Sequence, residues 1–189
     1  MHPFPISEPL KTHPPFNYPY DSSYSSHRSM KPINAISVSV GILVTLWTYA
    51  TLGYLEPKVI TWITFLTWAS FYAAGAGTAG LAKSIACGAV GALVSALVVW
   101  VNGRVGGGTA GVGLVIFALL LGGLGWTLCR MSQVSLLGVI PASFIGAASF
   151  FGAGAPLDQK LAWVLVSLVC AAIMGLLSQR LAALLTERS

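Results

Sequence analysis

The chain contains one octapeptide twice, and the two copies relate its first half to its second. The first copy, ASFYAAGA, covers residues 69–76, and the second, ASFFGAGA, covers residues 148–155. The spacing that aligns Ala69 with Ala148 also aligns Trp47 with Trp126, each followed by a threonine, and no gap is needed. We call this constant spacing the repeat offset. The chain is therefore expected to consist of two similar halves with one architecture.

Composition favours a membrane protein. Hydrophobic residues make up 56% of the chain and charged residues 8%, and the mean hydropathy is +0.80. A soluble domain carries about a quarter charged residues, so this chain cannot cover itself with groups suited to water. Only helices and closed barrels satisfy their backbone inside a bilayer. The alternating strands of a barrel are absent, so we predict an all-α integral membrane protein.

Six apolar runs, separated by Gly, Pro and Asn breakers, are expected to form six transmembrane helices. Their approximate bounds are Ile33 to Leu52, Val59 to Ala76, Leu81 to Val101, Gly111 to Cys129, Val134 to Phe151 and Leu161 to Leu185. Repeat one covers about 33–103 and repeat two about 111–185. Three spans per repeat is an odd number, so the second repeat enters from the opposite face. The expected fold is a 3+3 inverted-topology repeat. Pro141, inside the fifth run, is expected to kink it.

Residues 1–30 differ from the rest of the chain. They are rich in Pro, Tyr and Ser and contain six of the ten prolines. This composition buries too little apolar surface to fold, and it lacks the apolar centre of a signal peptide. Met30 directly precedes the first span and would suit a start of translation. Two interpretations stay open, a disordered tail or a segment that is not made, and residues 31–189 form the membrane domain in both.

Basic residues in the loops indicate an orientation. With six spans, one face carries both termini and the residues Lys11, Arg28, Lys31, Lys83, Arg130, Arg180 and Arg188. The other face carries Lys58, Arg104 and Lys160, together with Glu56 and Asp158. Cytoplasmic loops carry the excess of Lys and Arg. We therefore expect both termini in the cytoplasm.

The two octapeptides are the candidate solute path. Their hydroxyls and rings suit a narrow pore for a small neutral or weakly charged solute, and their glycines weaken a helix enough to break it. The duplicated Trp-Thr pairs either extend this path or belong to the aromatic belts of the interface. The candidate residues are Ser70, Phe71, Tyr72, Gly75, Ser149, Phe150, Phe151, Gly154, Trp47 and Trp126. Ordinary helix packing through small residues is the other interpretation.

Small residues recur every four positions in the third and sixth runs. The two stripes are Gly88, Ala92 and Ala96, and Ser167, Ala171 and Gly175. Such stripes allow helix backbones to approach closely in membranes. We expect contacts there within the subunit or between subunits, so a homo-oligomer through spans three and six is one prediction.

The spans contain no residue suited to catalysis or metal binding. No Asp, Glu, Lys, Arg or His lies well inside any run, and all three histidines are in residues 1–30. No nucleophile–base pair is present. The three cysteines lack the spacing of a zinc site or a disulfide framework. The formal charge of +5 is spread over loops and termini rather than gathered in a patch for nucleic acid. We expect no enzyme activity, no cofactor and no nucleic-acid partner.

Two pairs of segments carry a resemblance to a known family. Residues 68–75 with 80–83, and residues 141–147 with 149–152, resemble small bacterial inner-membrane proteins catalogued as domain of unknown function 1097. The resemblance covers about Met30 to Leu185. It implies an integral inner-membrane protein and supplies no substrate and no active residues.

Two functional hypotheses follow. The first is a passive channel or facilitator for a small neutral or weakly charged solute, based on the inverted repeat and the uncharged spans. The second is a non-transporting partner or scaffold subunit, based on the small-residue stripes. An intramembrane enzyme ranks well below both.

Overall fold

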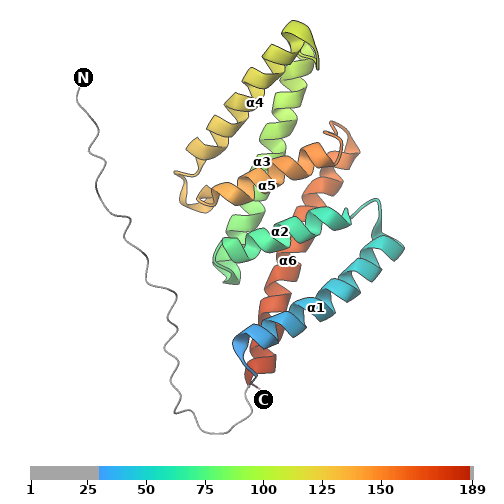
Figure 1. Ribbon diagram of the computed structural model, residues 1–189, viewed down its shortest axis with the longest axis vertical. Helices are drawn as coiled ribbons and strands as arrows, with labels where there is room; N and C mark the ends of the chain where they lie inside the picture. The colour runs from blue at the N-terminus through green and yellow to red at the C-terminus, as the bar shows by residue number, and fades with distance from the viewer. Residues whose placement is uncertain (1–29, 188–189) are drawn as a thin grey trace, which may run out of the picture.

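The computed structural model describes residues 30–187, which form a bundle of α-helices (Figure 1). The expected tail, residues 1–29, lies outside the described residues. The elements are α1 Pro32–Ala50, the π-helical turn η1 Thr51–Leu55, α2 Thr61–Ala73, α3 Gly77–Arg104, α4 Gly111–Met131, the 3-10 turn η2 Ser135–Leu137, α5 Ile140–Gly152 and α6 Gln159–Glu187. The all-helical prediction is confirmed over this range.

Four of these helices are long and apolar enough to cross a membrane. They are α1 continued by η1 (Pro32–Leu55), α3, α4 and α6. They indicate a multi-pass membrane protein. The second and fifth predicted spans are shorter than expected, because α2 and α5 have 13 residues each. At about 1.5 Å per residue each is about 20 Å long, less than the hydrocarbon core of about 30 Å.

The element bounds repeat at the offset found in the sequence. The short helix α2 covers 61–73 and α5 covers 140–152, so both ends of one helix correspond to the ends of the other at the repeat offset. The helices α1 and α4 begin at 32 and 111, which correspond in the same way. The two halves therefore contain the same order of a long, a short and a long helix.

The start of α5 corrects one prediction. The fifth apolar run was expected to be helical from Val134 and kinked at Pro141. Instead the chain forms η2 and a short connection, and α5 begins at Ile140 with Pro141 in its first turn. A proline there removes no helical hydrogen bond, since the first N–H groups of a helix have no partner within it. The predicted kink is wrong for this reason.

The short helices lie in the middle of the molecule. In Figure 1, α2 and α5 lie side by side, run in opposite directions and cross α3 and α6, which contact each other. Each short helix packs mainly on a long helix of the other half, α5 on α3 and α2 on α6. The helices α1 and α4 lie outside, against α6 and α3 respectively. The start of α1 and the end of α6 lie at the same end of the molecule.

Glycines allow the backbones of α3 and α5 to touch. A Cβ atom on Gly146 would overlap the carbonyl group of Gly88, and one on Gly91 would overlap the carbonyl oxygen of Ser143. In α6, a Cβ on Gly175 would lie 2.6 Å from the ring of Phe71. All six members of the two small-residue stripes are buried within the single chain. Packing inside the subunit thus accounts for the stripes, and the homo-oligomer stays a prediction.

The buried polar groups belong to one chemical class. Within residues 30–187 they are all serines and threonines: Ser39, Thr51, Thr61, Thr64, Thr67, Ser70, Ser84, Ser95, Ser143, Ser149, Ser167 and Ser178. A hydroxyl both donates and accepts a hydrogen bond and carries no charge. The interior of the bundle therefore offers neutral hydrogen-bonding groups on an apolar background.

Candidate functional site

The two octapeptides form the ends of the two short helices, and they do so with the same backbone. After α2, Gly75 has φ 96° and Ala76 has φ 56°, and after α5, Gly154 has φ 93° and Ala155 has φ 50°. The hydrogen bonds match as well, because the N–H of Ala76 reaches the Phe71 carbonyl at 3.1 Å and that of Ala155 the Phe150 carbonyl at 3.0 Å. Both helices thus break at the glycine that the sequence singles out.

The serines of the two octapeptides have different partners. The Ser70 hydroxyl lies 2.6 Å from the Ser84 Oγ on α3 and 2.8 Å from the Thr67 carbonyl oxygen. The Ser149 hydroxyl is fully buried and has no partner among the described residues. The Thr67 Oγ1 is also buried and unpaired within residues 30–187. An unpaired buried hydroxyl costs about 1–3 kcal/mol, so both hydroxyls have hydrogen-bonding capacity that the described residues do not use.

The aromatic residues of the octapeptides form two matching pairs. Phe71 and Tyr72 make an edge-to-face contact with ring centroids 5.2 Å apart, and Phe150 and Phe151 make the same contact at 5.3 Å. Phe71 and Phe150 are fully buried in the bundle. Of the sequence-predicted rings, these two are therefore packing residues in this structure.

Trp47 and Trp126 lie in different surroundings. The Trp47 indole donates a hydrogen bond of 3.0 Å to the Thr64 hydroxyl on α2. Trp126 is 67% exposed on α4, and the guanidinium of Arg130 lies 6.0 Å from the centroid of its ring. The structure does not bring these two tryptophans together. A tryptophan stacked with an arginine at a helix end suits the interfacial belt.

Ser178 on α6 is the centre of a hydrogen-bonded group that the sequence reasoning missed. Its Oγ lies 3.0 Å from the Trp68 Nε1 and 2.7 Å from the Tyr72 hydroxyl, both on α2. Its backbone carbonyl accepts a hydrogen bond of 2.6 Å from Ser39 on α1. The partners lie in the other half of the chain, far from Ser178 in the sequence. In the sequence, the only indication of this group was that Ser39 and Ser178 lie within otherwise apolar runs.

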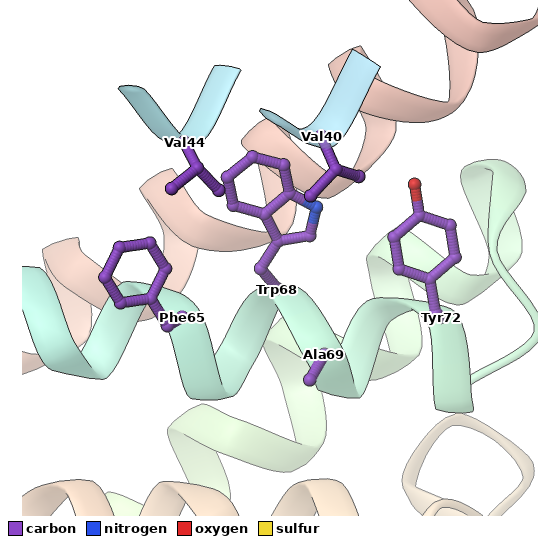
Figure 2. Close-up of a pocket in the computed structure, with 6 residues that line it drawn as sticks. All are labelled: Val40, Val44, Phe65, Trp68, Ala69 and Tyr72. Atoms are coloured by element: carbon purple, nitrogen blue, oxygen red, sulfur yellow. The ribbon is translucent and has the colours of Figure 1, made fainter. Parts of the chain in front are cut away.

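A groove lies between α1 and α2, beside the Ser178 group (Figure 2). It has a volume of about 320 Å³ and an almost entirely apolar lining. Its walls are formed by Val40, Val44, Phe65, Trp68, Ala69 and Tyr72. Of the ten candidate path residues, only Tyr72 lines it. The groove is therefore distinct from the buried hydroxyls of α2 and α5.

The residues that could bind a metal are dispersed. Within residues 30–187, no three His, Cys, Asp or Glu side chains come together. The three cysteines are free, and the thiol of buried Cys87 lies 3.7 Å from the Leu136 carbonyl oxygen. The chemistry available in the core is thus hydrogen bonding by hydroxyls.

Comparison with known proteins identifies a family. The family model described as "Protein of unknown function (DUF1097)" matches residues 37–183. No curated protein and no solved structure matches the chain.

Proposed function

The chain belongs to the DUF1097 family of proteins of unknown function, and we propose that it is a passive facilitator for a small neutral or weakly charged solute. The proposed location is the bacterial inner membrane. The proposed path runs along the core helices α2 and α5 rather than through the groove. On this proposal the protein lets the solute pass without catalysing a reaction.

The observation that carries this proposal is the matched pair of short helices. In transporters built from inverted repeats, solute sites lie where interrupted helices occupy corresponding positions of the two halves. Here α2 and α5 correspond at the repeat offset and break at Gly75 and Gly154. They also lie side by side and antiparallel in the middle of the molecule. This arrangement supports a 3+3 inverted repeat, in which the short helices and their extended ends complete two further crossings.

The buried hydroxyls favour a neutral solute. Thr67 on α2 and Ser149 on α5 are fully buried, and their oxygens have no partner in the described part of the chain. A neutral amide or polyol can exchange hydrogen bonds with such groups, whereas an ion requires more ligands or an opposite charge to replace its water. Urea, glycerol, formamide and ammonia are thus the first solutes to test.

The proposed orientation places both termini in the cytoplasm. Lys31, Lys83, Arg130 and Arg180 would then lie on the cytoplasmic face, in accordance with the positive-inside rule. The start of α1 and the end of α6 lie at one end of the molecule, which supports an even number of crossings.

The test is solute flux in proteoliposomes. Stopped-flow light scattering would compare vesicles that hold the full chain with empty vesicles for each of the four solutes. We expect faster equilibration for at least one of them, and loss of that gain in the double variant Ser70→Leu with Ser149→Leu. Flux that is unchanged by the double variant would contradict the proposed path.

A second candidate function is a membrane partner or scaffold subunit. It is favoured by α4, whose apolar stretch is only 11% buried. Val112, Leu119 and Trp126 leave most of their surface exposed on this helix. A partner helix seated there would co-purify in mild detergent. Equal flux with and without protein for every solute, together with a stable co-purifying membrane protein, would favour this candidate over the facilitator.

A further inference from the structure

The groove between α1 and α2 offers no free polar group along its walls. Figure 2 shows Trp68 between Val40 and Val44 of α1 and the helix α2, with Tyr72 at one end. The Trp68 indole N–H and the Tyr72 hydroxyl are both hydrogen-bonded to Ser178. The polar atoms of the lining are thus engaged inside the protein. What remains for an occupant is an apolar surface.

In the second half, the residue that corresponds to Trp68 packs against the outer helix α4. Trp68 corresponds to Ala147, and Ala147 packs against Leu124 and Leu128 of α4, which are 6% and 1% exposed. The residues of α1 that correspond to these leucines at the repeat offset are Thr45 and Tyr49. Both are exposed, and Tyr49 is 68% exposed.

The helices α1 and α2 leave this groove open between them. Protein interiors are packed without voids of this size, and walls without a neighbour lose their dispersion contacts. At about 320 Å³ the groove is near the lower end of ligand sites, which begin at about 300 Å³. It therefore has room for a slender apolar occupant.

We propose that this groove holds one acyl chain of a membrane lipid. Both walls belong to apolar helices, and α1 with η1 has the length and composition of a membrane span. Hydrocarbon is therefore the medium at the open side of the groove. This site does not depend on solute transport, since it is separate from the hydroxyls of α2 and α5.

The test is photocrosslinking with a phospholipid that carries a diazirine in the middle of an acyl chain. The full chain is reconstituted in phosphatidylethanolamine vesicles that contain this probe, irradiated, and mapped by peptide mass spectrometry. We expect adducts concentrated at Val40, Val44, Phe65 and Ala69. Ala69→Phe fills the groove from α2 and is expected to lower these adducts several-fold.

The repeat supplies a matched control. Ala148 is the counterpart of Ala69 and is likewise exposed on its short helix, so Ala148→Phe should leave the groove adducts unchanged. Val44→Phe narrows the groove from α1 and should act like Ala69→Phe, which guards against a folding defect in one variant. Adducts spread evenly over all exposed apolar helices, or adducts equally reduced by Ala148→Phe, would overturn the proposal.

Discussion

Ser70 and Ser149 occupy the same position of the repeated octapeptide, yet within the described residues only Ser70 has a hydrogen-bond partner. The Ser70 Oγ lies 2.6 Å from the Ser84 Oγ, whereas the Ser149 Oγ is buried and unpaired among residues 30–187. The position that corresponds to Ser84 in the second half is occupied by Trp163, which has no hydroxyl. The two helix ends are thus alike, while only Ser70 has a hydroxyl partner within residues 30–187.

Alanine at these two serines should therefore have different effects on stability. Ser70→Ala removes a hydrogen bond and leaves the Ser84 hydroxyl without this partner, so we expect a loss of about 1–3 kcal/mol. Ser149→Ala removes an unpaired buried hydroxyl and should be neutral or stabilising. Thermal unfolding in mild detergent measures both. An equal loss in the two variants would show that Ser149 is hydrogen-bonded inside the protein.

Alanine at Gly91 should weaken the contact between α3 and α5. The new Cβ would overlap the Ser143 carbonyl oxygen, and overpacking of this kind costs about 1–3 kcal/mol or more because backbone has to shift. Gly122→Ala is the matched control, since Gly122 is exposed on α4 with no atom within 4 Å of its Cβ position. We expect a lower unfolding temperature for Gly91→Ala alone. Equal stability of the two variants would contradict the close contact.

Alanine at Gly75 and at Gly154 should cost similar amounts. The two glycines have φ values of 96° and 93°, and a residue with a Cβ is disfavoured there by about 1–2 kcal/mol. Gly41→Ala in the middle of α1, where the Cβ position is open, should instead stabilise by about 0.5–1 kcal/mol. Thermal unfolding in mild detergent compares the three variants. If an octapeptide instead formed part of a continuous helix, alanine at its glycine would not lower the unfolding temperature, and that result would contradict the break.

The Tyr72 hydroxyl should stabilise the fold, whereas the corresponding position of the second half has no hydroxyl. Tyr72→Phe removes the 2.7 Å hydrogen bond to Ser178 and should cost about 0.5–1.5 kcal/mol. The corresponding residue Phe151 is already a phenylalanine, and the counterpart of Ser178 is Val99. Thermal unfolding compares Tyr72→Phe, which removes only the hydroxyl, with Phe151→Leu, which changes packing alone. The comparison separates the effect of the hydroxyl on stability from the effect of the ring. A Tyr72→Phe variant as stable as the unaltered chain would rule out a role for this hydrogen bond.

The sequence predicted the helical class, the two halves and the points where the short helices break. It overestimated the lengths of the second and fifth spans, because the apolar composition continues past the helix ends. Ala76 and Ala155 take positive φ values, and alanine carries no signal for such a conformation. Residues Val134 to Val139 are similarly apolar, although they form a 3-10 turn and a connection rather than helix.

The candidate site was predicted only in part for a different physical reason. The glycine breaks and the buried phenylalanines follow from the repeated octapeptide. The Ser178 group depends on tertiary contacts between α1, α2 and α6, and no local pattern marks them. The different surroundings of Trp47 and Trp126 also arise from packing, since α1 lies against α6 while Trp126 faces outward on α4.

The most direct test of the facilitator is solute flux through the Ser149→Leu variant beside its neighbour variant Ala148→Leu. Position 149 is fully buried in the proposed path, and position 148 is exposed on the same helix. Stopped-flow light scattering on proteoliposomes, with monodisperse protein of both variants, provides the comparison. We expect the conducted solute to equilibrate at the rate of empty vesicles in Ser149→Leu and at the unaltered rate in Ala148→Leu. Equal flux through the two variants would contradict a solute path along α2 and α5.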